Sequence, residues 1–379
     1  MKKENRAKLL EAESLIQESN FSSAKELLKE LLNEDYQNID ALNDLAVVSI
    51  LTENYNEATN YINRVLQIDQ QNEIALENFR FLEQSGKVAI QKEEIVNSDH
   101  EKINCPFCNS MEATVYRNSA DIVKCNNCDT IYLRTRLKKE KMYELYQSYA
   151  DGDSHMSIPS SEEEVKSSGL RRDYFMDEIL EFVEPNGNFL DIGCGWGAFL
   201  DNAKSRGFSP RGIEMTRKCV SFANEKLNIK VTNDQFEDTH FDDESLSVVS
   251  MNHVFEHLPY PLDALNKLFR VLKPGGMFCG IVPNIESYVS KQLTEEWYWL
   301  DPNFHYVHYS PKTIKKQLEN AGFIVERLYT ITGDYGQQNV RKEFEKTLDF
   351  TDSDFQEMLE KVEKNGEGEE IRFFARKPK

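Results

Sequence analysis

The chain has 379 residues, a length that predicts two or three domains, each able to bury a hydrophobic core. Its formal net charge of -20 argues against nonspecific binding to nucleic acid or to an anionic membrane, because such surfaces need clustered Lys and Arg. The first residues carry charge in every helical turn, so we expect neither a secretion signal nor a membrane span, and we expect a cytoplasmic protein. Four of the seven cysteines form two C-x-x-C pairs, which fit metal ligation and reduced thiols better than disulfides.

Residues 1–90 contain an internal repeat with a period of 34 residues. Sliding the sequence by that period aligns residues of similar size, namely Asn20-Phe21 with Asn54-Tyr55, Ala24 with Ala58, Leu28 with Ile62, and Leu31-Leu32 with Val65-Leu66. Apolar residues recur at helical spacing within each period, which predicts a helix hairpin. The pattern resembles the tetratricopeptide repeat, and a partial third unit from Glu73 to Glu83 supplies a closing helix.

The resemblance implies that the repeats dock a protein partner or mediate self-association. The alternative is a small helical bundle that only solubilises or dimerises the rest of the chain. Polar residues of mixed charge at 86–101 predict a linker after the repeats.

Two cysteine pairs, Cys105-Pro-Phe-Cys108 and Cys125-Asn-Asn-Cys128, have sixteen residues between them. Strand-forming residues fill that interval, and the region 102–136 resembles a zinc ribbon. Four sulfur ligands leave no open coordination position, so we expect a structural zinc; reduced cysteines without metal are the alternative. We expect residues 137–187 to form a helical linker or lid. Basic residues at its start either dock a phosphate-bearing substrate or form a solvated helix face.

From Asn188 onward, apolar strands alternate with amphipathic helices, which predicts a mainly parallel sheet covered on both faces. The first strand leads into the glycine-rich turn of FLDIGCGWGAFL, residues 189–200, and the second strand ends at Glu214. A carboxylate there can accept both ribose hydroxyls of a nucleoside, which suits NAD and S-adenosylmethionine (SAM) alike. Asp191, before the glycines, would repel a pyrophosphate and suits a ligand with a cationic end, as SAM has.

Residues 171–378 resemble the class I SAM-dependent methyltransferases, through LDIGCGWG, the acidic residue Glu214 and VVSMNHVFEHLPYPLDALNKLFRVLKPGGMF. The resemblance implies a multidomain protein in which residues 188–379 form a Rossmann-like α/β domain of seven strands. It implies that Asp191, Gly193 and Gly195 hold the methionine part of SAM and that Glu214 holds the ribose. It also implies that Met215 covers the adenine and that Asp234, Gln235 or Phe236 contacts the adenine edge. Asn252 and His253 would line the floor of the site near the methyl group.

Histidines concentrate after the fourth strand of this region. The stretch VFEHLPYP and the later WYWLDPNFHYVHYSPKTIKKQLENAGF resemble ubiquinone-type O-methyltransferases and sugar methyltransferases. A hydroxyl acceptor needs a proton sink, and histidine serves that purpose near neutral pH. The candidate bases are His257 or His305, with His253 and His308 behind them, and Glu256 is an orienting carboxylate or a metal ligand. Each of these histidines has a purely structural alternative.

The end of the sequence predicts two more strands, FIVERLYTI and EEIRFFARKP, with a helical insertion at about 334–365 between them. We expect the insertion to form either a lid over the acceptor or a surface decoration.

The sequence favours an enzyme that transfers a methyl group from SAM to oxygen or nitrogen of a small molecule, such as a sugar or a specialised metabolite. The first alternative is a methyltransferase acting on a protein or carrier-bound substrate docked by the repeats. A second is a sugar C-methyltransferase, since a zinc ribbon also precedes such domains, although we do not expect the extra C-terminal domain of those enzymes in this chain. A third is an interaction protein that only binds SAM.

Overall fold

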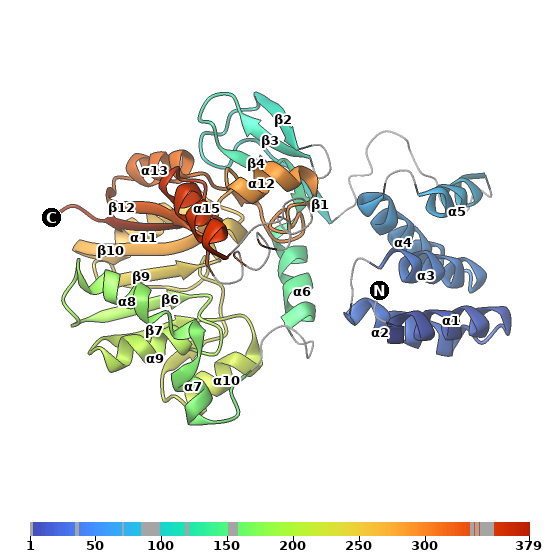
Figure 1. Ribbon diagram of the computed structural model, residues 1–379, viewed down its shortest axis with the longest axis horizontal. Coiled ribbons are helices and arrows are strands. Elements are labelled where there is room, and N and C mark those ends of the chain that lie inside the picture. The colour runs from blue at the N-terminus through green and yellow to red at the C-terminus, as the bar shows by residue number, and fades with distance from the viewer. Residues whose placement is uncertain are drawn as a thin grey trace. The chain divides into compact units, whose positions relative to one another are not determined.

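The structure is a computed structural model that describes residues 3–34, 38–69, 72–84, 99–117, 121–150, 158–333, 337, 341 and 352–379 (Figure 1). The chain divides into two compact units, Met1–Asn97 and Ser98–Lys379. The predicted linker lies largely outside the described residues. In the ranges given above, no helix is both long and apolar enough to cross a bilayer.

The first unit consists of helices in which each packs on the next along the chain: α1 (Lys3–Gln17), α2 (Phe21–Glu34), α3 (Ile39–Leu51), α4 (Tyr55–Ile68) and α5 (Glu73–Gln84). The aligned pair Ala24 and Ala58 is fully buried, as is the pair Leu28 and Ile62. Small residues at the helix contacts let neighbouring backbones approach, and the larger ones fill the space between hairpins. The predicted helical repeats are confirmed.

A second feature repeats with the same period. Asn38 precedes α3 and its side-chain oxygen accepts a hydrogen bond from the backbone N–H of Ala41 at 3.0 Å. Asn72, 34 residues later, precedes α5 and accepts from Ala75 N–H at 3.1 Å. Each asparagine thus satisfies one of the backbone donors that a helix start leaves unpaired.

The second unit begins with the cysteine-rich region. Its strands are β1 (His100–Lys102), β2 (Ala113–Arg117), β3 (Ile122–Cys125), β4 (Ile131–Leu133) and β5 (Thr135–Leu137). Strands β2, β3 and β4 form an antiparallel sheet, and β1 pairs with β5. A fourth strand, β11 (Val307–His308), joins the sheet of β2, β3 and β4 by pairing with β4, although it lies far along the chain. The ribbon therefore shares a sheet with the domain that follows it.

The seven-stranded sheet has the order β12-β13-β10-β9-β6-β7-β8. Its strands are β6 (Asn188–Ile192), β7 (Ser209–Ile213), β8 (Lys230–Thr232), β9 (Leu246–Asn252), β10 (Leu272–Pro283), β12 (Ile324–Ile331) and β13 (Glu370–Arg376). Strands β8, β7, β6, β9 and β10 are parallel, whereas β13 runs antiparallel to both of its neighbours. The strand order reverses at β6 and β9, and ligands of such sheets bind beyond the carboxyl ends at that point. The predicted seven-stranded α/β fold is confirmed.

Helices cover both faces of this sheet (Figure 1). Apolar side chains of α8 (Asp173–Leu180), α9 (Ala198–Ser205) and α10 (Arg217–Glu225) pack with Phe189, Val248 and Phe374 on one face. The next residue along each of these strands points to the opposite face of the sheet. Helices α11 (Pro261–Val271) and α13 (Pro311–Asn320) pack on that face. The remaining helices are α6 (Lys139–Ala150), α7 (Glu162–Ser167), η1 (Gly169–Arg171), η2 (Phe255–His257), α12 (Tyr288–Leu293), η3 (Thr294–Glu296) and α15 (Asp352–Lys364). Most of the predicted insertion before α15 lies outside the described residues.

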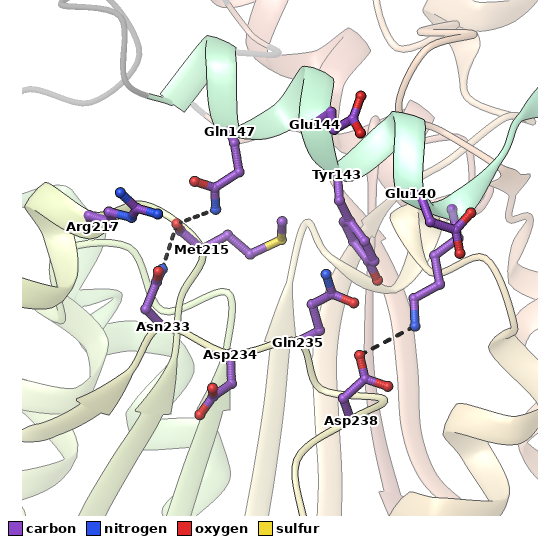
Figure 2. A pocket seen from close by; sticks show the side chains of 11 residues that line it. Glu140, Tyr143, Glu144, Gln147, Met215, Arg217, Asn233, Asp234, Gln235 and Asp238 are labelled. Atoms are coloured by element: carbon purple, nitrogen blue, oxygen red, sulfur yellow. Dashed lines mark hydrogen bonds and ion pairs between the residues drawn. The ribbon is translucent and has the colours of Figure 1, made fainter. Parts of the chain in front are cut away.

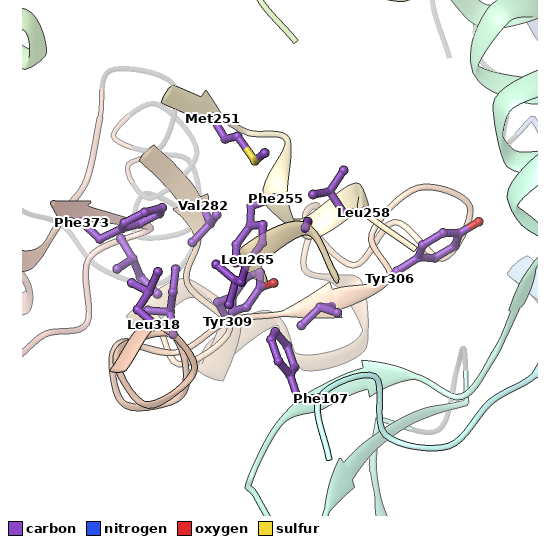
Figure 3. Packing of buried hydrophobic residues seen from close by; sticks show 14 of the residues in the cluster. Phe107, Met251, Phe255, Leu258, Leu265, Val282, Tyr306, Tyr309, Leu318 and Phe373 are labelled. Carbon is purple, nitrogen blue, oxygen red and sulfur yellow. The ribbon is translucent and has the colours of Figure 1, made fainter. Parts of the chain in front are cut away.

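The core on the second face is continuous with the ribbon. Phe107, which stands between two cysteines, belongs to the same cluster of buried residues as Tyr309 and Leu318 (Figure 3). Met142 of α6 joins this cluster as well. Burial of apolar surface therefore holds the ribbon and the sheet together as one unit.

A substitution at Gly280 would test the tight packing of the sheet. A Cβ at this position would lie 2.3 Å from the carbonyl oxygen of Met251 and 2.8 Å from Cζ of Phe373. We expect Gly280→Ala to lower the free energy of unfolding by about 2–4 kcal/mol, because backbone and core must shift. All three tryptophans lie in the second unit, so urea unfolding followed by their fluorescence reports on it.

Gly169→Ala is the matched control, because a Cβ there meets nothing within 4 Å. Equal unfolding midpoints for the two variants would contradict the packing described here.

Candidate functional site

The glycine-rich turn connects the central strand β6 to helix α9. Gly193, Gly195 and Gly197 all have positive φ, the backbone region that glycine adopts without strain. At Gly193 a side chain is also excluded by space, since a Cβ would lie 2.4 Å from Cγ2 of Val254. The turn therefore lies directly against the segment that follows β9.

Glu214 closes the turn from the end of β7. Its carboxylate accepts hydrogen bonds from the backbone N–H of Gly195 at 2.8 Å and of Thr216 at 2.7 Å. The side chain is buried, and two bonds leave further acceptor positions on its two oxygens. The predicted ribose acid thus lies beside the glycines and holds their conformation.

Asp191 is the last but one residue of β6 and is buried. Its Oδ1 accepts a hydrogen bond from the Ser250 hydroxyl at 2.6 Å. Burial raises the pKa of Asp191 to about 7, and the Ser250 hydrogen bond offsets part of this rise. A cationic ligand would stabilise the ionised carboxylate at this position.

A cavity of about 690 Å³ lies next to these residues, at the carboxyl ends of β7 and β8 (Figure 2). Met215, Asp234 and Gln235, which are three of the residues predicted to contact adenine, line this cavity. Phe236, the fourth residue of that prediction, is buried beneath Lys267 and is not among the residues that line the cavity. Helix α6 supplies the opposite wall with Lys139, Glu140, Tyr143, Glu144 and Gln147.

The carboxyl end of β9 carries the predicted floor residues. Both polar side-chain atoms of Asn252 are buried and have no hydrogen-bond partner among the described residues. His253 has φ of +55°, a left-handed conformation that costs energy for any residue with a Cβ. Its ring stacks on Trp299 with centroids 5.2 Å apart. An unpaired amide and a strained histidine thus lie side by side at the switch point of the sheet.

Next to them is a cluster of one carboxylate and two imidazoles, formed by Glu256 and His305, which are buried, and His257, which is half-buried. One ligand atom from each of the three lies within 4.8 Å of the other two. Neither oxygen of Glu256 has a hydrogen-bond partner in the part of the chain that the structure describes. His257 Nδ1 is 2.9 Å from the Phe304 carbonyl and His305 Nδ1 is 2.8 Å from the Trp299 carbonyl. These bonds orient both rings through their Nδ1 atoms.

Burial decides the protonation of this cluster. It raises the pKa of Glu256 to about 7. It also lowers the pKa of His305 well below its ordinary value, and His257 nearby acts in the same direction. The pKa of His308 falls to about 3, again through burial. The buried imidazoles His305 and His308 are therefore neutral, with lone pairs available.

The four predicted histidines are brought together, although by different elements. His253 lies 3.8 Å from Glu256 Oε1 through Nδ1, and 3.6 Å from Glu370 Oε1 through Nε2. His308 lies in β11, the strand paired with the ribbon, and its Nε2 is buried without a partner in the described ranges. Its ring centroid is 6.2 Å from that of His305.

The four cysteines form a second cluster, apart from the histidines. Their sulfur atoms all lie within 4.8 Å of one another, with Cys105 and Cys128 at 3.4 Å and Cys108 and Cys125 at 3.5 Å. Tetrahedral zinc with bonds of about 2.3 Å requires sulfur separations of roughly 3.8 Å, so the four thiols fit this ion. The predicted cluster of four cysteines is confirmed.

Sequence reasoning missed two contributions to the site. Glu370 of β13 pairs with His253, although it lies more than a hundred residues further along the chain, and no local pattern indicates this pairing. Tyr143 and Gln147 of α6 line the cavity, although the sequence predicted only a linker or lid here. Their spacing of four residues puts them on one helix face, which was the available clue.

Comparison with known proteins identifies two regions. Residues 169–328 match the model of a methyltransferase domain, and residues 15–78 match that of a tetratricopeptide repeat. A ubiquinone biosynthesis O-methyltransferase of Alkalilimnicola ehrlichii is 28% identical over 138 residues, 34% of this chain and 54% of that protein. A demethylmenaquinone methyltransferase of Staphylococcus aureus is 27% identical over 173 residues, 38% of this chain and 70% of that protein. The chain thus spans about half the length of the first relative.

Solved structures with a similar fold include a SAM-dependent methyltransferase from Archaeoglobus fulgidus, with a TM-score of 0.41 and 20% identity, covering 57% of this chain and 97% of that one. Another is geranyl diphosphate C-methyltransferase from Streptomyces coelicolor, with a TM-score of 0.43 and 15% identity over 62% of this chain and 98% of that one. By these family matches, the chain carries a methyltransferase domain, preceded by a tetratricopeptide repeat.

Proposed function

We propose that this protein transfers the methyl group of SAM to a hydroxyl oxygen of a small molecule. The observation that carries the proposal is the cluster of Glu256, His257 and His305 beside the glycine-rich turn. Val254, two residues before Glu256, contacts Gly193 of that turn. A donor bound at the turn would therefore present its reactive end toward the cluster.

The cofactor would lie along the carboxyl ends of β6, β7 and β8. Asp191, Gly193 and Gly195 would hold its methionine end, and Glu214 its ribose. Met215, Asp234 and Gln235 would line the adenine pocket, which is the cavity already described. SAM supplies an electrophilic methyl group on a sulfonium, and the chain's residues align the acceptor for an in-line displacement.

The cluster is suited to a divalent cation. A buried carboxylate without a hydrogen-bond partner is costly unless a positive charge compensates it. His257 and His305 donate through Nδ1 to backbone carbonyls, which is the arrangement found for histidines that bind metals through Nε2. We infer that Glu256, His257 and His305 would hold a divalent cation, and such a cation would supply Lewis acidity toward an acceptor hydroxyl.

His253 would then accept the proton of the acceptor hydroxyl. It lies between two carboxylates, with Glu256 Oε1 at 3.8 Å and Glu370 Oε1 at 3.6 Å. Its stacking on Trp299 and its backbone hydrogen bond to the Ile281 carbonyl at 2.8 Å hold the ring in place. His253 thus takes the role of base in this proposal, and His257 and His305 take that of ligands.

Methyl-labelled SAM incubated with the protein and a cell extract tests the activity. We expect label in the small-molecule fraction and formation of S-adenosylhomocysteine. Label in the protein fraction would instead support a partner docked by the repeats, and label in none of the fractions would overturn the proposal.

The cation site is tested by Glu256→Gln. We expect this variant to lose at least tenfold in affinity for Mn²⁺, measured by electron paramagnetic resonance, because a carboxylate ligand becomes a neutral amide. Glu369→Gln is the matched control, since Glu369 is also buried but accepts hydrogen bonds from Trp297 and Tyr298. Unchanged Mn²⁺ binding in Glu256→Gln would refute the ligand set.

The pH dependence of cofactor binding follows from Asp191. Its pKa of about 7 means that the carboxyl is largely protonated at pH 6 and ionised at pH 8. Because the amino group of S-adenosylhomocysteine would pair with the carboxylate, its affinity should rise roughly tenfold over this interval. Calorimetric titrations at several pH values measure the affinity for S-adenosylhomocysteine. Asp191→Asn should bind more weakly at pH 8 and show a flat profile; a wild-type profile that falls with pH would argue against this pairing.

A structural zinc in the ribbon predicts a defined metal content. We expect one zinc per chain by elemental analysis, and Cys105→Ser should lose it and lower the unfolding midpoint of the second unit. Cys219→Ser is the control, because this buried cysteine lies outside the cluster. Full zinc content in Cys105→Ser would contradict ligation by that thiol.

A further inference from the structure

Helix α6 lies outside the methyltransferase family match yet forms one wall of the cavity at the ends of β7 and β8 (Figure 2). The matched region begins at residue 169, whereas α6 ends at Ala150. The cavity is therefore completed by a segment that the family domain does not supply.

Two side chains of α6 bond to the loops that hold the predicted adenine contacts. Gln147 Nε2 donates to the carbonyl of Met215 at 2.9 Å. The Tyr143 hydroxyl donates to Glu237 Oε1 at 3.0 Å, two residues after Gln235. Asn233 also donates to the Met215 carbonyl, at 2.6 Å, so this loop is held from both sides of the cavity. The wall is thus fastened to the two loops whose spacing sets the width of the cavity.

The ribbon fixes the position of this wall. Helix α6 begins two residues after β5 ends, and the Lys138 N–H donates to the Asp99 carbonyl at 2.7 Å. The Tyr306 hydroxyl, next to β11, donates to the Leu137 carbonyl at 2.8 Å. Buried Met142 anchors the helix in the core that the ribbon shares with the sheet. Tyr143 and Gln147 therefore project into the cavity from a fixed support.

We infer that α6 is part of the cofactor site and that Tyr143 and Gln147 contact the adenosine end of SAM. This inference rests on the proposed function. A tyrosine ring offers an apolar face for a purine, and the Gln147 carbonyl oxygen can accept a hydrogen bond from an amino group. The ribbon module thus contributes side chains to cofactor recognition as well as a structural metal site.

Affinities measured for two ligands test this placement. S-adenosylhomocysteine contains both ends of the cofactor, and 5′-methylthioadenosine contains only the adenosine end. We expect Tyr143→Ala and Gln147→Ala each to weaken both ligands by about tenfold, and by the same factor, because the lost contacts are to adenosine. Isothermal titration calorimetry measures both affinities, and tryptophan fluorescence during urea unfolding shows whether the variant is intact.

Lys141→Ala is the control on the same helix, since its side chain is 41% exposed and is not among those that line the cavity. It should bind both ligands as the wild type does. Unchanged affinity in Tyr143→Ala and Gln147→Ala, or a loss confined to S-adenosylhomocysteine, would overturn the role of α6 while leaving the proposed function intact. If the wild-type protein bound neither ligand, the proposed function itself would fail.

Discussion

The pairing of β11 with β4 is the constraint on which the arrangement of the second unit depends. Two residues, Val307 and His308, extend the ribbon sheet and thereby fix the loop before them, which carries His305 and Trp299. The same loop provides the carbonyl that orients His305 and the ring on which His253 stacks. One short stretch of backbone hydrogen bonds, with the apolar core beneath it, consequently positions the ribbon, the loop before β11 and the histidine cluster.

The two sides of the proposed reaction centre use opposite means of controlling charge. On the cofactor side, Asp191 is buried but hydrogen-bonded, so its carboxylate is ready to pair with a cationic ligand. On the acceptor side, Glu256 is buried with no hydrogen-bond partner among the described residues, which favours a metal cation. Both sites gain strength because water is largely excluded, and in both the free protein carries a cost that a bound ligand relieves.

The sequence was sufficient for features set by local pattern. The 34-residue period predicted the helix hairpins because small residues recur wherever backbones touch, and the cysteine spacing predicted the ribbon because ligation requires it. Glycines at 193 and 195 predicted the turn after β6, whereas its role in binding a cofactor stays a prediction. Pairings between distant segments were beyond reach: the contact of Glu370 with His253, the addition of β11 to the ribbon and the position of Tyr143 depend on tertiary packing. For Phe236 the local pattern was not sufficient: this aromatic residue lies beside predicted adenine contacts in the sequence, but it packs in the hydrophobic core.

The fixed position of Glu214 affects how tightly a nucleoside could bind. Its carboxylate is already fixed by two backbone N–H groups, one on each oxygen, and in the proposed cofactor site its remaining acceptor positions would receive the ribose hydroxyls. The conformational entropy of this side chain and of the glycine-rich turn is therefore lost during folding rather than during association. Preorganisation of this kind leaves more of the interaction energy for affinity.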